Sequence, residues 1–164
     1  MAKYRIFNVP EFDGKDTTPL HAAIPRVSKD PQLLVESCSY GDSEVAASWV
    51  LKALVEQEGV ERFDMETAFA ALHTKAEWQT NLHLLQLVKY APEAATKYVA
   101  IVRDLMSADK VLVRVWALDA FVRIAGVAPE FRQQAAGAVE GALGKTPASL
   151  RARARVLKVI CALW

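Results

Sequence analysis

The chain has 164 residues and a formal net charge of +1; 52% of the residues are hydrophobic and 24% are charged. The length is that of one domain, and the composition is typical of a globular chain rather than a disordered one. No apolar run approaches the roughly 20 residues that a membrane-spanning helix needs. The N-terminal residues also lack the apolar core of a secretory signal. The sequence therefore predicts a soluble, cytoplasmic protein without a membrane partner.

Charge is distributed unevenly along the chain. Residues 31–66 have two basic and eight acidic side chains, whereas residues 145–164 have five basic and no acidic ones. The two ends of the predicted helical array, which begins near residue 30, therefore differ in the sign of their charge, which bears on the choice of partners rather than on the fold.

Residues 1–29 are predicted to form an irregular N-terminal arm. Pro10, Pro19 and Pro25 argue against a long helix, although one helical turn is expected after Thr18. Helical-repeat arrays need a polar cap at each end, so we expect the apolar side chains of the arm to cover the first repeat: Ile6, Phe7, Val9 and Phe12.

Residues 30–164 are predicted to form a domain of about four helix pairs. Asp30 and Pro31 open the first pair as an N-cap followed by proline at the first helical position. Gly59 and Gly126 are expected to end the second helices of pairs one and three. The predicted first helices cover residues 32–39, 64–73, 92–106 and 129–143, and the second helices cover residues 42–57, 76–90, 109–126 and 147–164.

The predicted second helices align with one another without gaps. Their corresponding leucines are separated by 34, 33 and 39 residues: Leu51, Leu85, Leu118 and Leu157. A helix-pair period in the thirties to forties indicates stacked repeats that share one continuous core. The predicted fold class is therefore all-α, an α-solenoid (α-α superhelix).

The segment from Ser107 to Val122 resembles the second helix of a HEAT-type repeat. In that pattern an Asp precedes the helix, Val-Arg follows, and small apolar residues lie three and six positions later. The matching residues are Asp109, Val113, Arg114, Ala117 and Ala120. A less close copy lies around Arg153, whereas Ala47 and Asn81 replace the arginine in the first two repeats. The resemblance covers about residues 31–164 and extends to uncharacterised bacterial HEAT-like proteins.

The resemblance implies a scaffold that binds other macromolecules, although a fold this widely shared does not determine a function. It also implies structural roles for Arg114 and Arg153, because this arginine usually bonds an Asp or a carbonyl of the preceding repeat. Asp109 is expected to cap its helix.

Most polar side chains of the predicted second helices fall on one stripe, at positions i, i+4, i+7 and i+11. Burying such groups without partners costs free energy, so the stripe is expected to face water or a ligand. The resemblance to HEAT repeats places it on the concave face. The candidate binding residues are Trp49, Lys52, Gln79, His83, Gln86, Tyr90, Trp116, Asp119, Arg123, Arg151, Arg155 and Lys158. Arg114 and Arg153 lie nearly opposite this stripe.

Exposed Trp and Tyr among Arg and Gln are typical of a binding surface. The leading prediction is a non-enzymatic scaffold or adaptor that binds a protein or peptide partner. The alternative interpretation is that both tryptophans pack between helices and the charges form a solvated face.

One enzymatic alternative remains. It is a nucleic-acid-binding HEAT-like protein related to the alkylpurine DNA glycosylases, whose motif is not reproduced residue by residue here; in those enzymes aromatic side chains hold a damaged base and a carboxylate stabilises positive charge. Trp49, Trp116, Asp119 and Arg155 are the candidates for such a set. Those enzymes are longer, however, and a net charge of +1 is not the basic excess expected of a protein that contacts many phosphates.

The last predicted helix has two unusual features. Its cations suit either nucleic acid or an acidic protein segment. Its end, from Val159 to Trp164, is strongly apolar, so we expect it to be covered by the chain itself or by a partner subunit in a homo-oligomer.

The sequence predicts no metal site and no cofactor. The three histidines lie on separate predicted elements without ligand spacing. Cys38 and Cys161 fit no metal or redox spacing and are expected to be buried, reduced thiols.

Overall fold

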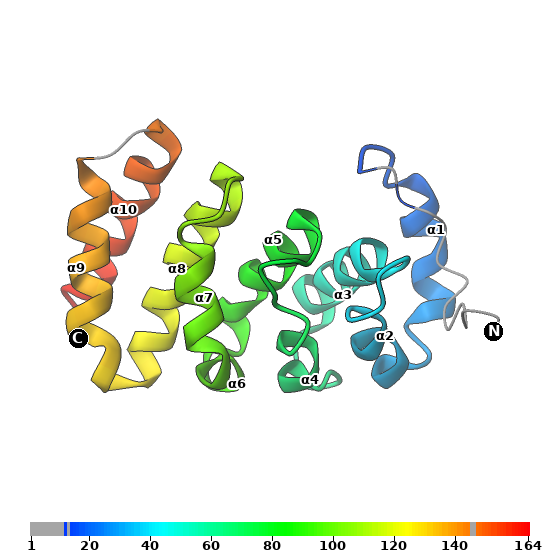
Figure 1. Ribbon diagram of the computed structural model, residues 1–164. Helices are drawn as coiled ribbons and strands as arrows, with labels where there is room; N and C mark the ends of the chain where they lie inside the picture. Colours follow the sequence, from blue (N-terminus) through cyan, green and yellow to red (C-terminus); the bar gives the residue numbers. More distant parts are fainter. Residues whose placement is uncertain (1–11, 13, 145–146) are drawn as a thin grey trace. The chain divides into compact units, whose positions relative to one another are not determined.

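The computed structural model describes residues 12, 14–144 and 147–164 (Figure 1). The described residues form helices and turns without a strand, which confirms the all-α prediction. Contacts divide the chain into two compact units, residues 1–87 and 88–164. None of the described helices combines the length and apolar character that crossing a bilayer requires. The predicted covering side chains Ile6, Phe7 and Val9 lie outside the described residues.

The first unit is built around α3. Its helices are α1 (Thr18–Val27), α2 (Pro31–Ser37), α3 (Glu44–Glu58), α4 (Met65–Phe69) and α5 (Trp78–Leu87). Helix α3 packs against α1, α2 and α5, and α2 also packs against α4 (Figure 1). Leu51 and Leu54 of α3 are completely buried. The core of this unit therefore lies around α3.

Local capping chemistry begins and ends several of these helices where the sequence predicts. The Asp30 carboxylate accepts the Leu33 N–H at 3.0 Å, and Pro31 follows at the first helical position. Asp64 accepts the Thr67 N–H in the same way at 3.1 Å. Gly59 ends α3 with φ = 89°, a conformation that favours glycine. These helix ends are set by residues within a few positions of them.

Residues 18–27 correct the prediction of an irregular arm, because they form the ten-residue helix α1. Pro19 lies in the first turn, where no N–H donor is needed. Pro25 removes one backbone hydrogen bond close to the end of the helix. Leu20, Ala23 and Val27 form one face that is at most 4% exposed. Burial of this face against α3 outweighs the cost of the prolines.

Helix α4 is shorter than predicted, because it ends at Phe69 rather than near His73. The Asn81 side chain of α5 bonds the His73 backbone twice. Its Oδ1 accepts the His73 N–H at 3.2 Å, and its Nδ2 donates to the His73 carbonyl at 2.8 Å. These two bonds satisfy the backbone of the segment after α4 without a helix.

The second unit is built around α8. Its helices are α6 (Pro92–Ala95), α7 (Val99–Leu105), α8 (Val111–Val127), α9 (Arg132–Leu143) and α10 (Ala148–Cys161), and its 3₁₀ turns are η1 (Val88–Tyr90), η2 (Thr96–Tyr98) and η3 (Pro129–Phe131). Helix α8 packs against α6, α7, α9 and α10. In Figure 1, α7 and α9 lie in front of α8 and α10. Helix α8 is apolar on nearly every side because neighbours surround it.

Three predictions for this unit need correction. The expected helix over residues 92–106 is interrupted at Thr96, whose hydroxyl donates to the Glu93 carbonyl at 2.7 Å. Asp109 does not cap α8, because the N-cap is Lys110 and no side chain makes a capping bond there. Helix α10 also ends at Cys161, short of the predicted Trp164.

Candidate binding surfaces

A hollow of about 300 Å³ lies where α1 meets α3 in the first unit. Two of its residues, Trp49 and Lys52, belong to the predicted stripe. The others come from α1 and from the same side of α3. Its lining residues are His21, Ile24, Trp49, Lys52, Ala53, Glu56 and Gln57.

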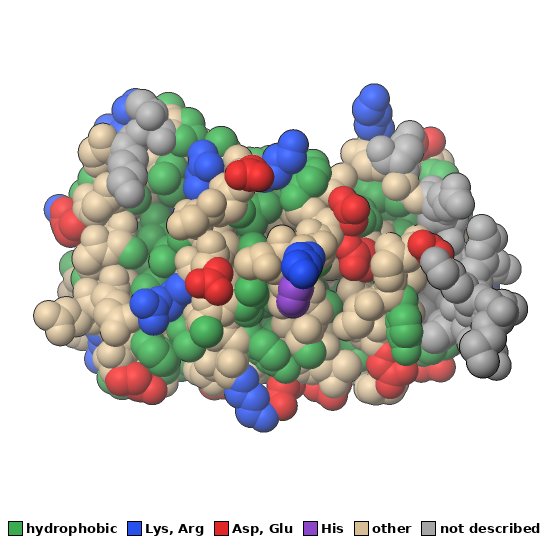
Figure 2. Space-filling model, viewed as in Figure 1, with side chains coloured by type: hydrophobic (Ala, Val, Ile, Leu, Met, Phe, Trp, Pro, Cys, Tyr) green, Lys and Arg blue, Asp and Glu red, His purple; other side chains and the backbone are tan. Residues whose placement is uncertain are grey.

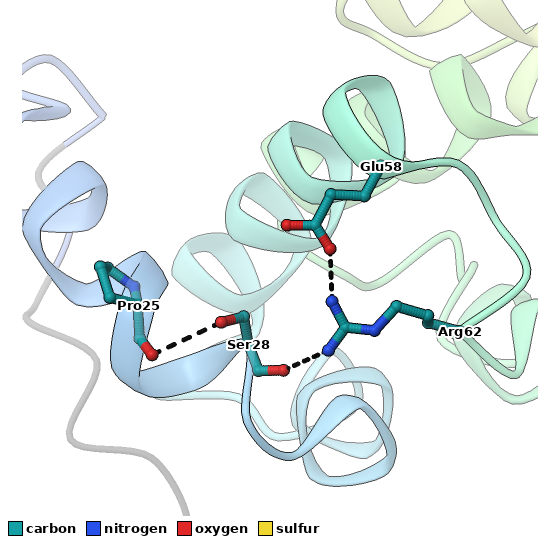
Figure 3. Close-up of polar contacts among 4 residues, drawn as sticks. All are labelled: Pro25, Ser28, Glu58 and Arg62. Atoms are coloured by element: carbon teal, nitrogen blue, oxygen red, sulfur yellow. Dashed lines mark hydrogen bonds and ion pairs between the residues drawn. The ribbon is translucent and has the colours of Figure 1, made fainter.

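Arg62 holds α1 in place beside this hollow. Its guanidinium donates to the Ser28 carbonyl at 2.6 Å and forms an ion pair with Glu58 (Figure 3). The Ser28 hydroxyl in turn donates to the Pro25 carbonyl at 3.5 Å. The ends of α1 and α3 are thereby joined through one side chain from the loop that follows α3.

Two kinds of chemistry meet inside the hollow. The ring centroids of His21 and Trp49 lie 4.9 Å apart at 84°, an edge-to-face contact. The Lys52 ammonium lies 2.9 Å from the Glu56 carboxylate, and both side chains remain partly exposed. The hollow therefore offers an aromatic wall and an ion pair, a combination suited to one bulky side chain with a polar neighbour.

His83 lies beneath this surface rather than on it, so the expectation that it faces water is wrong. Its side chain is buried, and its Nδ1 lies 2.9 Å from the Ser48 Oγ. The Ser48 hydroxyl donates to the Val45 carbonyl at 3.0 Å, so the His83 Nδ1–H donates to Ser48. Burial, with a smaller effect from Lys52, lowers the pKa of His83 to about 4. The imidazole is therefore neutral at pH 7.

Gln79 and Gln86 of α5 are half-buried. The Gln79 Oε1 is buried and has no hydrogen-bond partner among the described residues. A Cβ placed on Gly14 would lie 3.5 Å from the Gln79 Nε2. The segment before α1 thus passes beside this part of the predicted stripe and partly covers it.

A second hollow, of about 260 Å³, lies between α3 and the loop from α4 to α5. Its residues are Ser39, Glu44, Ala70, Ala71, His73, Lys75 and Ala76. Glu44 is 9% exposed, and its carboxylate accepts the Glu77 N–H at 2.7 Å. This carboxylate is therefore used to hold the chain just before α5, and the sequence analysis did not single it out.

Asp119 in the second unit also corrects the prediction that it faces a groove. Its side chain is 2% exposed. One carboxylate oxygen lies 3.4 Å from the Arg123 Nε and the other lies 3.3 Å from the Arg153 Nη1. Two guanidinium groups therefore compensate for the burial of this charge.

Arg153, which the sequence places nearly opposite the stripe on its own helix, contacts two stripe residues of α8. Its guanidinium carbon is 4.3 Å from the centroid of the Trp116 ring, and its Nη1 contacts Asp119. The HEAT resemblance implied that this arginine bonds an Asp of the preceding repeat, and Asp119 of α8 occupies that place. Trp116 is half-buried under this contact.

Arg114 bonds carbonyls, as the resemblance implied, but those of the loop directly before its own helix. Its Nη1 donates to Ala108 at 2.9 Å and to Asp109 at 3.4 Å. Asn81 occupies the matching position in α5 and bonds His73 in the loop before that helix. Both side chains hold a loop to the helix that follows it through hydrogen bonds to backbone groups of the loop. In the sequence, only the alignment of Asn81 with Arg114 indicated this role for Asn81.

The stripe residues of α10 differ from one another in their surroundings. Lys158 pairs with Glu140 of α9 at 2.9 Å, so it lies on the α9 side of the helix. Arg151 is half-buried, and Arg155 is exposed. Tyr90 is exposed as predicted, with the Lys89 ammonium 4.6 Å from its ring centroid.

Metal-ligand side chains do not gather elsewhere in the described part of the chain. No group of three or more His, Cys, Asp or Glu among them is placed to hold a metal ion. Burial raises the pKa of the Cys38 thiol to about 12, while Cys161 is only half-buried. On the face of α7 and α9 that Figure 2 shows, basic and acidic side chains lie scattered among apolar ones.

Family models, curated proteins and solved structures all give no match to this chain. The resemblance to HEAT repeats therefore stays a prediction that rests on residues 107–122 and their less close copies.

Proposed function

We propose that this protein is a non-enzymatic helical-repeat scaffold that binds a protein or peptide partner. In this proposal its helix pairs form a HEAT-like α-solenoid. The hollow between α1 and α3 receives one bulky side chain of the partner, and the neighbouring stripe residue Gln86 contacts the partner's backbone.

The observation that carries the proposal is the composition of the hollow. Trp49 is a half-buried indole at the wall of a space of about 300 Å³. Tryptophan dominates binding energy at many interfaces because it offers a large, rigid contact area. This volume lies at the lower end of the range for ligand pockets, about 300–1,000 Å³, so it suits a side chain better than a large cofactor.

The state of the ionisable groups supports a non-enzymatic role. The Asp119 carboxylate, which the glycosylase alternative needs in an open cleft, is occupied by Arg123 and Arg153. His83 is held by Ser48 beneath the surface. Neither group is presented to a substrate.

The proposal is tested with Trp49→Ala in the full chain, used as bait in a quantitative affinity pull-down. The matched control is Tyr40→Ala, which removes an aromatic side chain that is 50% exposed outside the hollow. We expect a partner that the wild type and Tyr40→Ala capture but Trp49→Ala loses. The purified partner should then bind Trp49→Ala at least tenfold more weakly in calorimetry. Equal capture by all three proteins, with unchanged circular dichroism, would show that the hollow is not the binding site.

A further inference from the structure

Helix α10 has a second apolar face that nothing in the described part of the chain covers. Three of its side chains are among the most exposed large hydrophobic groups described: Val156 at 53%, Val159 at 65% and Leu163, just past the helix end, at 81%. Exposed alanines extend the same face toward the start of the helix. Successive members are three or four residues apart, so they share one side of the helix. This open face comprises Ala148, Ala152, Val156, Val159 and Leu163.

The other side of α10 is a conventional packing face. Leu150, Ala154 and Leu157 are buried, and α10 packs against α8 and α9. A helix that is apolar on two sides is normally covered on both. Helix α8 shows this arrangement, because α6, α7, α9 and α10 surround it. The open face of α10 therefore has the composition of an interface.

The border of the open face is basic. Arg151 and Arg155 are four residues apart and lie along one edge of it. Neither guanidinium has an ion-pair partner among the described residues, whereas Arg153 is held by Asp119 and Lys158 by Glu140. Residues 147–164 contain no acidic side chain. A complementary partner therefore needs apolar side chains flanked by carboxylates.

We propose that the open face of α10 is a docking surface for an acidic amphipathic helix of another protein. A helix is the occupant because the face is a straight row with helical spacing, about 20 Å long over the 14 residues of α10. The apolar stripe of the partner packs along this row, and its Asp and Glu side chains pair with Arg151 and Arg155. This surface is separate from the hollow between α1 and α3.

Other occupants fit the charges less well. An antiparallel two-fold pair of open faces would bring Arg151 and Arg155 of both copies together. Helix α1 of a second copy has no acidic residue to offer. Nucleic acid would contact the two cations but gain nothing from the apolar row, and a duplex-binding protein commonly contacts about 6–10 phosphates.

The probe is a fluorescein-labelled helical peptide of about three heptads, with Leu at positions a and d and Glu at e and g. A matched peptide carries Lys at e and g. In fluorescence anisotropy with the full chain, we expect the Glu peptide to bind at least tenfold more tightly than the Lys peptide. Val159→Asp should abolish this binding, and Arg151→Glu with Arg155→Glu should reverse the preference between the peptides.

Leu112→Asp is the control, because Leu112 is 49% exposed on α8, outside the open face. It should bind as the wild type does. Val159 is already mostly exposed, so its replacement should leave the thermal midpoint unchanged.

Equal affinity for both peptides, or Glu-peptide binding that survives Val159→Asp, overturns the proposal. A wild-type dimer that Val159→Asp dissociates in sedimentation overturns it in favour of a second copy. Salt-sensitive binding of a DNA duplex that needs both arginines, with no peptide binding, overturns it in favour of nucleic acid.

Discussion

Arg153 of α10 contacts Asp119 of α8 across 3.3 Å, and the two residues are 34 positions apart in the chain. The same carboxylate accepts from Arg123 one turn further along α8, at 3.4 Å. Arg153 also covers the face of Trp116. One buried carboxylate thus joins two helices of the second unit, and its role in the structure is to stabilise their packing.

Asp119→Ala should lower the free energy of unfolding by about 2 kcal/mol, because it leaves two guanidinium groups without their partner. The loss is smaller than for a fully buried pair, since Arg123 and Arg153 are 34% and 28% exposed. Urea unfolding followed by circular dichroism measures it. Glu140→Ala removes a pair that is 57% exposed on both sides, and its loss should stay below about 1 kcal/mol. Equal effects of the two variants would contradict the structural role of Asp119.

Asn81→Ala should release the segment around His73. Both backbone groups of His73 lose their partner, so we expect a loss of about 2 kcal/mol in unfolding free energy. The sharper measurement is hydrogen exchange of the His73 amide, which should become much faster. Gln86→Ala, a change at a half-buried site in the same helix, should leave that amide protected. An unchanged exchange rate in Asn81→Ala would show that the Asn81 side chain does not hold the His73 backbone.

His83 makes stability depend on pH. Its pKa falls from an ordinary 6.5 to about 4 in the folded protein, mainly through burial. Between these values the unfolded chain binds a proton that the folded chain does not. The free energy of unfolding therefore falls by about 3 kcal/mol from this group as pH drops from 6.5 to 4. Above pH 6.5 the imidazole is neutral in both states, so none of this stability is lost there.

His83→Asn keeps a donor toward Ser48 and should flatten the pH dependence in this window. Gln86→Asn, a change at a half-buried site of the same helix that involves no titratable group, should leave the dependence as it is. Unfolding by urea at several pH values gives the comparison. An NMR titration of the His83 ring with a midpoint near 6.5 would show that this prediction is wrong.

Arg62→Ala should loosen α1. The substitution removes the bond to the Ser28 carbonyl and the ion pair with Glu58 (Figure 3). We expect about 1 kcal/mol of destabilisation, since the side chain is partly exposed. Trypsin should then cut faster at Lys29, just after α1. Arg103→Ala, at an exposed position in the second unit, is the control and should not change that rate.

Much of the local structure follows from nearby residues. Asp30 with Pro31, Asp64 and Gly59 set helix ends through bonds and backbone angles that span only a few positions. Predictions based on longer segments were less accurate. Thr96 interrupted one helix and Asn81 shortened another, each through a side-chain bond to the backbone that hydrophobic periodicity does not reveal.

The candidate site was only partly predictable. Trp49 and Lys52 lie in a hollow as members of the predicted stripe, but His21 and Glu56 complete it. His21 could not be found from the sequence, because the prolines of α1 argued against the helix that carries it. Asp119 was expected at the surface because Arg153, one of the two arginines that compensate for its burial, lies on another helix.

The sequence by itself determined that the chain is helical, where most helices begin, and that α8 is surrounded by neighbours, because capping and all-round apolarity act within one helix. Only the tertiary structure decided which side of each helix meets which neighbour. Helical periodicity groups Arg151, Arg155 and Lys158 on one side of α10, but it does not say that Arg153 meets α8 or that Lys158 meets Glu140. Which residues meet depends on burial and charge pairing between positions far apart in the chain. The folding of α1 against α3 despite its two prolines depends on such burial as well.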